Sequence, residues 1–291
     1  GFIVTLIYVL VTISFFSLFD LSLTENIKFF YAGIFFSSLY GFFDDLKDRG
    51  VLTKLFIQKI LAILLLFTFW DFINSLFFSE ATLLKIFTLF LIYFLIIWFS
   101  NAINFMDGID GMLASGSVLI FLSSSTLMII VGNHSTNILL ILILIPILLG
   151  FLFFNLSKFK LFLGDSGSLF LAFFISFFVL ETLSQNELTL WAWLILLSYF
   201  LTETTFTTII RIIITKDWYK PHKSHAYQNL ARVLDSHMKI TLSAVFFHIV
   251  WLLPLAYFAV ILPNLGLILF IVASIPVLIF TLIYGPLYSK D

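Results

Sequence analysis

Long stretches without a formal charge recur along this chain. No Asp, Glu, Lys or Arg occurs between Lys85 and Asp107, or between Asp110 and Lys158. Over the whole chain 62% of the residues are apolar and 11% are charged, whereas a soluble protein has about 45–50% apolar and about 25% charged residues. An α-helix crosses the hydrocarbon core of a bilayer with about 20 apolar residues. The sequence therefore predicts an integral membrane protein with many spanning segments.

The apolar stretches are continuous and do not alternate with polar residues, which favours helices over the strands of a membrane barrel. We expect an all-α, polytopic transmembrane helical bundle that forms one domain over residues 1–291. Hydropathy predicts about ten spans. They lie near residues 2–16, 29–43, 57–70, 86–100, 114–131, 138–154, 166–180, 190–210, 240–260 and 265–285.

The basic residues predict the orientation of these spans, because Lys and Arg concentrate in cytoplasmic loops. If the segment 44–56 is cytoplasmic, the alternation of spans places four further loops on the same side. They are 101–113, 155–165, 211–239 and 286–291. Together all of these segments and their flanks hold every Lys and Arg except Lys28 and Lys85. A net charge of −1 gives no excess of positive charge for nucleic acid. The absence of Cys excludes thiolate chemistry.

The first of four polar clusters on the predicted cytoplasmic face contains Asp44, Asp45 and Asp48. On a helix Asp44 and Asp48 share a face, and Asp45 is turned about 100° away. Like charges this close cost energy unless a cation offsets them. The equal alternative is a solvated loop in which Lys47 and Arg49 balance the acids.

The second cluster follows a long apolar run and has no basic residue nearby. Asn101, Asn104, Asp107 and Asp110 recur every three residues, so on a helix their oxygens would form one stripe. Carboxylates without a positive partner at a membrane boundary need a cation, and hard oxygen ligands favour Mg²⁺, with Mn²⁺ as the alternative. The other interpretation is a plain turn between two spans.

The third cluster runs from Gly164 to Ser168 and opens another span. A glycine-rich turn that leads into a helix leaves free backbone N–H groups, where a phosphate can bind. Asp165 taken alone fits a helix N-cap. Its place beside the other acidic loops is what favours a binding site.

The fourth cluster lies in the longest cytoplasmic loop, where His222, His225 and Gln228 again fall three residues apart. The basic residues around them are Arg211, Lys216, Lys220 and Lys223. This composition suits a phosphate-bearing anion, whereas a zinc pair on a helix would prefer a spacing of four and a third ligand. We expect no catalytic role for His237 or His248.

One carboxylate, Glu203, lies inside an otherwise uncharged predicted span. An ionisable residue at membrane depth indicates a functional site by default. The equal alternative is a structural pair between Glu203 and Arg211, which lies near the cytoplasmic end of the same span.

Clustered carboxylates imply a divalent cation, and the basic loop implies a phosphorylated substrate. The sequence therefore favours metal-assisted phosphoryl chemistry between a soluble and a lipid phosphate ester. In this order the clusters resemble the polyprenyl-phosphate N-acetylhexosamine-1-phosphate transferases, the glycosyltransferase family 4 group, and are closest to its O-antigen-initiating branch. The matching pieces are Asp44-Asp45-x-x-Asp48, Asn101-x-x-Asn104-x-x-Asp107-Gly-x-Asp110-Gly, Gly164-Asp165-x-Gly-Ser168 and the His222/His225 loop.

The resemblance implies an Mg²⁺-dependent enzyme that moves a sugar 1-phosphate from a UDP-N-acetylhexosamine to undecaprenyl phosphate and releases UMP. The donor would carry N-acetylfucosamine, N-acetylquinovosamine or N-acetylglucosamine, and the product would start an O-antigen or another cell-surface polysaccharide. The active site would face the cytoplasm from a bacterial inner membrane. A homodimer is left open.

By motif match, Asp165 and Asp107 would hold Mg²⁺ on the donor pyrophosphate. Asp44 or Asp45 would act on the lipid phosphate as a base or as a covalent nucleophile, and Phe162 would stack on uracil. The other expected site residues are Asp110 with a catalytic role, and Asn101, Asn104, Asp48, Lys47, Gly164, His222, His225, Gln228 and Arg211 with substrate-binding roles.

Other functions stay open at this point. Within the family they are an enterobacterial-common-antigen-type N-acetylglucosamine-1-phosphate transferase and phospho-MurNAc-pentapeptide transferase, although the triple-His pattern of the latter is absent. Outside it, an ion-coupled transporter would place polar residues at mid-membrane, and a metal-independent lipid phosphatase would not need the Asp clusters. Gly1 matches the end of a Pro-Arg-Gly-Gly segment of the family, which predicts a further span before this chain.

Overall fold

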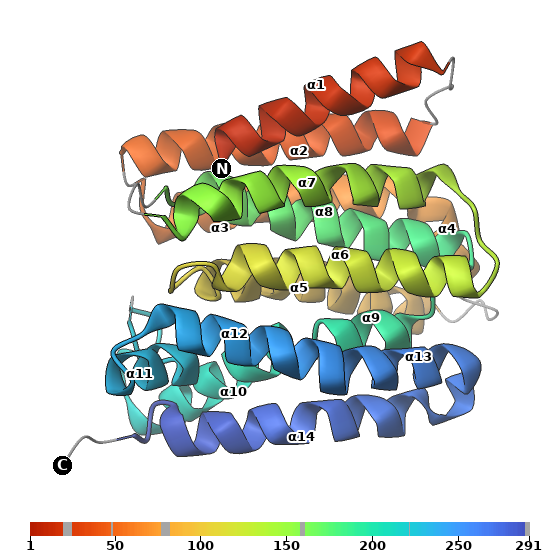
Figure 1. Ribbon diagram of the computed structural model, residues 1–291. Coiled ribbons are helices and arrows are strands. Elements are labelled where there is room, and N and C mark those ends of the chain that lie inside the picture. Colours follow the sequence, from red (N-terminus) through yellow and green to blue (C-terminus); the bar gives the residue numbers. More distant parts are fainter. Residues whose placement is uncertain (20–24, 48, 77–81, 158–160, 221, 289–291) are drawn as a thin grey trace. The chain divides into compact units, whose positions relative to one another are not determined.

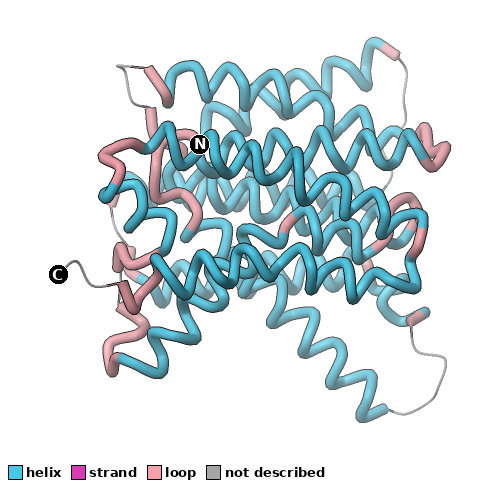
Figure 2. Tube along the Cα trace, turned by 60° about the horizontal axis from the view of Figure 1, so that its bottom comes forward, coloured by secondary structure: helices cyan, strands magenta, loops and turns pink. Residues whose placement is uncertain are grey.

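The computed structural model describes residues 1–19, 25–47, 49–76, 82–157, 161–220 and 222–288, and within them the chain is helical without any β-strand (Figures 1 and 2). The predicted all-α fold is confirmed. The elements are α1 (Phe2–Leu18), α2 (Glu25–Leu46), α3 (Val51–Thr68), α4 (Trp70–Ser75), α5 (Thr82–Phe105), α6 (Met112–Ile130), α7 (Thr136–Asn155), α8 (Gly164–Ser184), α9 (Leu190–Leu196), α10 (Ser198–Ile214), α11 (Ala226–Val233), α12 (His237–Phe247), π-helix η1 (His248–Leu252), α13 (Leu253–Ile261), 3₁₀-helix η2 (Pro263–Leu265) and α14 (Gly266–Tyr284).

Seven helices among the described residues are long and apolar enough to cross a membrane, and the bent pair of α9 and α10 makes an eighth candidate if its parts cross as one span. All ten predicted spans are helical, and eight of them coincide with these candidates. Of the other two, α1 is apolar but shorter, and α2 has charged residues at both ends. The protein is therefore a multi-pass membrane protein, and the number ten stays a prediction.

Two predicted spans are not continuous α-helices. The span at 190–210 bends by 68° between α9 and α10. The span at 240–260 contains the five-residue π-helix η1, which ends two residues before Pro254. Proline lacks an N–H group and its ring crowds the preceding turn, so a helix commonly distorts at this place.

The chain divides into two compact units. Unit 1 comprises Gly1–Asn104 and Phe162–Asn186, and therefore holds α1 to α4, almost all of α5, and α8. Its core is a set of buried aromatic rings: Phe30 on α2 lies 4.7 Å from Phe177 on α8, and Tyr8 on α1 lies 5.4 Å from Phe174 (ring centroids). Lipid is as apolar as this core, so van der Waals packing between helices is what holds them together.

A close approach of α2 and α8 positions the first acidic cluster. A side chain at Gly41 would overlap the backbone of Ser166, and a small residue at a helix contact lets two backbones come this near. One turn before, the hydroxyl of Ser38 lies 3.0 Å from the hydroxyl of Ser166. This contact brings the end of α2, with Asp44 and Asp45, to the N-terminus of α8.

Unit 2 comprises Phe105–Leu161 and Glu187–Asp291. Within it α6 packs against α7 and α12, and α14 packs against α9, α10 and α13 (Figure 1). The short helix α11 contacts both α12 and α14. The loop between α5 and α6, which carries Asp107 and Asp110, and the segment before α11 both belong to this unit.

Candidate active site

Asp45 caps the N-terminus of α8. Its two carboxylate oxygens accept hydrogen bonds from the backbone N–H groups of Asp165 (2.8 Å) and Ser166 (3.2 Å). Gly164 begins the helix at φ +67°, a conformation that glycine adopts without strain. The expectation that these N–H groups are free to bind a phosphate is therefore wrong, because Asp45 already occupies them. Asp165 is not the cap either, since its side chain points to another partner.

That partner is Lys54 on α3, which the sequence analysis counted only among the positive charges. Its ammonium donates hydrogen bonds to Asp165 Oδ1 (2.5 Å) and Asn104 Oδ1 (2.9 Å). The hydroxyl of Ser168 also donates to Asn104 Oδ1 (2.9 Å). The Lys54 side chain is only 15% exposed. A lysine at the start of an apolar helix that follows an acidic motif is the signal that would have identified it.

Asp44 completes this cluster in unit 1. Its Oδ1 accepts a hydrogen bond from the backbone N–H of Arg49 (2.9 Å), and its carboxyl shares a hydrogen bond with Asp165. Burial first, and then this shared hydrogen bond, raises the pKa of the Asp44 carboxyl, while Lys54 acts in the opposite direction. Two carboxyls this close need a shared proton or a cation.

Lys47 and Phe162, two further predicted substrate-binding residues of unit 1, are both exposed. Lys47 is exposed just after the end of α2, and Asp48 lies outside the described residues. Phe162, on the loop before α8, has a ring that is 71% exposed. An exposed ring is compatible with stacking on a base, and that role stays a prediction.

Asn101 faces α3. Its amide group donates to Gln58 Oε1 (2.9 Å) and accepts from Gln58 Nε2 (3.3 Å). Gln58 is buried, so the two amides satisfy each other's hydrogen-bonding groups. The structure thus uses Asn101 to join α5 to α3, one turn away from the Asn104 that contacts Lys54.

The predicted helical stripe of four oxygens is wrong beyond Asn104. Helix α5 ends at Phe105, and Asp107 and Asp110 lie in the loop that follows. Gly111 takes φ +79° there, a left-handed conformation that a regular helix does not contain. Because Asp107 belongs to unit 2 and Asp165 to unit 1, a shared metal site of these two residues stays a prediction.

Contacts with α7 and α12 hold the loop of Asp107 within unit 2. His237 Nδ1 lies 3.1 Å from Asp110 Oδ2, and the hydroxyl of Thr241 donates to the carbonyl oxygen of Asp110 (2.9 Å). The N–H of Gly111 donates to Asn155 Oδ1 (2.6 Å). His237 therefore anchors this loop from the first turn of α12, a role that the sequence analysis missed.

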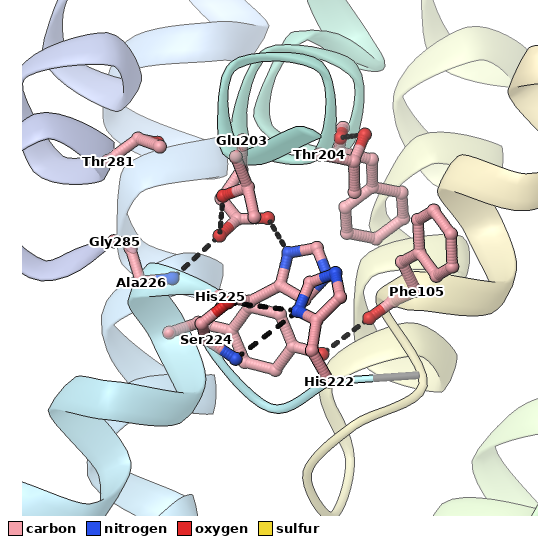
Figure 3. Close-up of polar contacts among 12 residues, drawn as sticks. Phe105, Glu203, Thr204, His222, Ser224, His225, Ala226, Thr281 and Gly285 are labelled. Carbon is pink, nitrogen blue, oxygen red and sulfur yellow. Dashed lines mark hydrogen bonds and ion pairs between the residues drawn. The ribbon is translucent and has the colours of Figure 1, made fainter. Parts of the chain in front are cut away.

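The histidine cluster is built around Glu203 on α10 (Figure 3). Glu203 Oε2 lies 2.8 Å from His225 Nδ1, and Glu203 Oε1 accepts a hydrogen bond from the backbone N–H of Ala226 (2.7 Å). The Glu203 side chain is fully buried and that of His225 is 2% exposed. The partner of Glu203 is therefore His225, and the alternative pairing with Arg211 is wrong.

Arg211 instead ties together the loop before α11. Its guanidinium donates to the carbonyl oxygens of Asp217 (2.9 Å) and Lys220 (3.5 Å) and to the hydroxyl of Ser224 (3.4 Å). The guanidinium of Arg211 orders this loop, because it donates to backbone carbonyls that have no partner within a helix.

His222 stacks on His225, with ring centroids 4.9 Å apart and an angle of 21° between the planes. Burial, followed by the proximity of His225 and Arg211, lowers the pKa of His222 to about 4. His222 is therefore neutral at pH 7. It offers an anion hydrogen bonds and no charge.

Helix α11 begins only after His225, so Gln228 alone of the three predicted residues lies on a helix. The hydroxyl of Tyr227 on α11 donates to the carbonyl oxygen of Phe105 (2.5 Å). A side chain at Gly108 would overlap Tyr227 and Gln228. The absence of a side chain at Gly108 thus lets α11 lie against the loop that carries Asp107.

With this geometry established, comparison with known proteins gives the family. Residues 27–183, more than half of the chain, match the family described as Glycosyl transferase family 4. The chain belongs to glycosyl transferase family 4. The matched part of this family 4 chain holds the first three polar clusters, from Asp44 to Ser168, and ends before Glu203, His222 and His225.

Curated relatives of this family 4 chain come from several bacteria. A probable undecaprenyl-phosphate N-acetylglucosaminyl 1-phosphate transferase of Bacillus subtilis is 35% identical over 210 residues, which cover 70% of this chain and 58% of that protein. A phospho-N-acetylmuramoyl-pentapeptide-transferase of Sulfurimonas denitrificans is 30% identical over 223 residues, which cover 67% and 60%. The enzyme of that same name from Leuconostoc citreum is 36% identical over 121 residues, or 40% and 37%. The chain thus spans no more than 60% of the length of these relatives.

The donor atoms around Asp165 suit a hard divalent cation in a family 4 site. Asp165, Asp44 and Asn104 present carboxylate and amide oxygens, the ligands that Mg²⁺ and Mn²⁺ prefer. In the described part of the chain no three His, Cys, Asp or Glu side chains group closely enough to hold a metal by themselves. Mg²⁺ usually takes only one or two protein carboxylates and completes its shell with phosphate oxygens and water, so the residues present fit this ion.

Proposed function

We propose that this family 4 chain carries the active site of an Mg²⁺-dependent enzyme, which transfers a sugar 1-phosphate from a UDP-N-acetylhexosamine to undecaprenyl phosphate and releases UMP. One observation carries the proposal: Lys54 and Asp45 bring residues of the first and third polar clusters, and Asn104 of the second, together at the N-terminus of α8, although Asp45 and Asp165 are separated by 120 residues. The names of these relatives describe phosphosugar transfer, which agrees with this chemistry.

In the proposed reaction an oxygen of the lipid phosphate attacks the phosphorus bonded to the sugar. The bond from that phosphorus to the bridging oxygen breaks, and UMP leaves with its electron pair. Mg²⁺ would supply charge neutralisation on the pyrophosphate, and Asp165 and Asn104 are the residues of unit 1 that would hold it. The resemblance adds Asp107.

Asp44 suits the role of base better than Asp45. Both oxygens of Asp45 accept backbone N–H groups, so protonation of Asp45 would break the cap of α8. The carboxyl of Asp44 has a pKa that burial raises, which moves it towards the pH at which a general base works well. We therefore propose that Asp44 is the base that accepts the proton of the lipid phosphate.

The test uses the full-length protein in detergent with undecaprenyl phosphate, Mg²⁺ and a panel of UDP-N-acetylhexosamines, and measures UMP release with and without a chelator. We expect chelator-sensitive release with one donor among UDP-N-acetylfucosamine, UDP-N-acetylquinovosamine and UDP-N-acetylglucosamine. In the folded Asp165→Asn variant the rate of UMP release should fall by at least about 10²-fold. This is the effect of removing one stabilising electrostatic interaction from a transition state. No release from any donor by folded wild-type protein would overturn the proposal.

A second candidate is phospho-MurNAc-pentapeptide transfer, because the relatives from Sulfurimonas denitrificans and Leuconostoc citreum carry that name. Its donor, UDP-MurNAc-pentapeptide, belongs in the same panel. We favour a smaller donor, since the sequence around His222 and His225 lacks the triple-His pattern. In the favoured case the product would start an O-antigen or another surface polysaccharide, and exclusive use of UDP-N-acetylglucosamine would point to the enterobacterial-common-antigen type.

We also propose that the site faces the cytoplasm from a bacterial inner membrane. The chain has no Cys, so single cysteines report sidedness without a background. A cysteine at the exposed Lys47 should be shielded from a membrane-impermeant thiol reagent in whole cells, and one at the exposed His134 should react. Reaction at position 47 alone would reverse the orientation.

A further inference from the structure

We propose that Glu203 is a positioning residue, which places the proton of His225 on Nδ1 and so leaves Nε2 as the unprotonated nitrogen that takes part in the transfer reaction. This inference rests on the proposed transfer reaction for its effect on activity. Its geometric basis is independent of that reaction, because it concerns hydrogen bonds within unit 2.

Glu203 is a buried carboxylate whose two oxygens have donors. Oε2 faces His225 Nδ1 at 2.8 Å, and Oε1 accepts from the backbone N–H of Ala226 at 2.7 Å (Figure 3). The hydroxyl of Thr207 donates to Oε1 as well, at 3.2 Å. A buried charge is tolerated only with such partners, so these three donors explain how a carboxylate stays at this depth.

The proton between Glu203 and His225 belongs to the imidazole. An ionised carboxylate can only accept hydrogen bonds, whereas a neutral imidazole carries one N–H group that can donate. Nδ1 of His225 is therefore the donor and Glu203 Oε2 the acceptor. With Nδ1 committed, only Nε2 remains to accept or give a proton, which is how a carboxylate sets the chemistry of a histidine.

Three aromatic rings restrict the orientation of the His225 ring. Their centroids lie 4.9 Å away for His222, 5.6 Å for Phe105 and 5.7 Å for Tyr227. An imidazole enclosed in this way does not rotate freely to exchange its two nitrogens. The hydrogen bond to Glu203 therefore decides which nitrogen carries the proton.

A purely structural role for Glu203 makes a different prediction, because its bond to Ala226 alone would hold the start of α11. The isosteric variant Glu203→Gln separates the two roles. The N–H of Ala226 can only donate, so the amide oxygen of the glutamine must stay at the Oε1 position. Its NH₂ group then faces Nδ1 and donates to it, which moves the proton of His225 to Nε2 while the clamp on Ala226 persists.

The experiment measures ¹⁵N signals of the histidine rings in the labelled full-length protein. The chain has only five histidines, and His225→Asn identifies the signal of interest by its loss. We expect a protonated Nδ1 in the wild type and an unprotonated Nδ1 in Glu203→Gln. In Thr207→Val, which removes one donor to Glu203 without touching His225, the proton should stay on Nδ1.

UMP release provides the second readout. We expect Glu203→Gln to lower kcat by about 10²-fold, the lower end of the effect of a misplaced acid–base group. The matched control is Thr204→Val on the same helix, whose hydroxyl donates to the backbone carbonyls of Phe200 and Leu201 on α10. Its activity should equal that of the wild type.

Each outcome decides one of the two proposals. The positioning role is overturned if Nδ1 of His225 stays protonated in Glu203→Gln. It is also overturned if the proton moves to Nε2 and the variant of an active enzyme keeps full kcat. A wild type that releases no UMP from any donor overturns the proposed function, and in that case the ring signals alone decide the role of Glu203.

Discussion

The carboxylate of Asp45 holds both backbone N–H groups at the first turn of the helix that begins with Asp165. The adjacent Asp44 has a different partner, the carboxyl of Asp165 itself. Two neighbouring acids on α2 thus have separate roles. Asp45 stabilises the N-terminus of α8, and Asp44 shares a hydrogen bond with the side chain of Asp165. Their substitutions should have separable effects.

Asp45→Ala should destabilise the protein, and Asp44→Asn should not. Loss of an N-cap costs about 0.5–2 kcal/mol, because the N–H groups of Asp165 and Ser166 lose their acceptor. Asp44→Asn removes one of two opposed carboxyls and should reduce UMP release by about 10²-fold at an unchanged melting temperature. Thermal unfolding in detergent and UMP release check this. Equal destabilisation by both substitutions would contradict the assignment.

Lys54→Met should make the thermal stability depend on Mg²⁺. Without the ammonium, Asp165 has an unbalanced negative charge near Asp44, and a divalent cation can replace the missing positive charge. We expect a lower melting temperature than the wild type in chelator and a larger increase on addition of Mg²⁺. Lys59→Met, at an exposed position of the same helix, is the matched control. Equal shifts in both variants would argue against a cation at Asp165.

Asp107→Asn and Asp110→Asn should differ although the chemical change is the same. Asp110 contacts His237, and an asparagine oxygen can keep that hydrogen bond, so we expect UMP release to fall by less than about 10-fold. The resemblance assigns Asp107 to the metal, so Asp107→Asn should lower UMP release by at least about 10²-fold. His237→Gln should behave like Asp110→Asn, because both change the same hydrogen bond. A larger loss at Asp110 than at Asp107 would reverse the two roles.

His222 should make the protein less stable in mild acid. Its pKa is about 4 in the folded protein and about 6.5 in an unfolded chain, so below pH 6.5 the unfolded state takes up a proton that the folded state refuses. Stability is therefore complete above pH 6.5 and falls as the pH drops towards 4. His222→Gln should show a smaller fall in melting temperature over this window. Parallel curves for both proteins would contradict the low pKa.

Hydropathy located every helix that the sequence analysis predicted, and the motif spacing identified most of the polar residues that the structure brings into contact. The spacing of three residues predicted a helix through Asp107 and Asp110, but α5 ends at Phe105. The motif spacing therefore misplaced these two residues. It also missed Lys54, since a lysine in a cytoplasmic loop is expected from topology alone. Helix ends and single polar contacts depend on neighbours that periodicity does not describe.

The membrane class and the all-helical fold followed from local properties, because in lipid each segment must satisfy its own backbone hydrogen bonds. The partners within the site did not. His225 and Glu203, Lys54 and Asp165, and Asp45 and Asp165 are separated by 22, 111 and 120 residues. Which of these groups meet depends on how close the helices approach, as at Gly41, and that distance arises from packing in three dimensions.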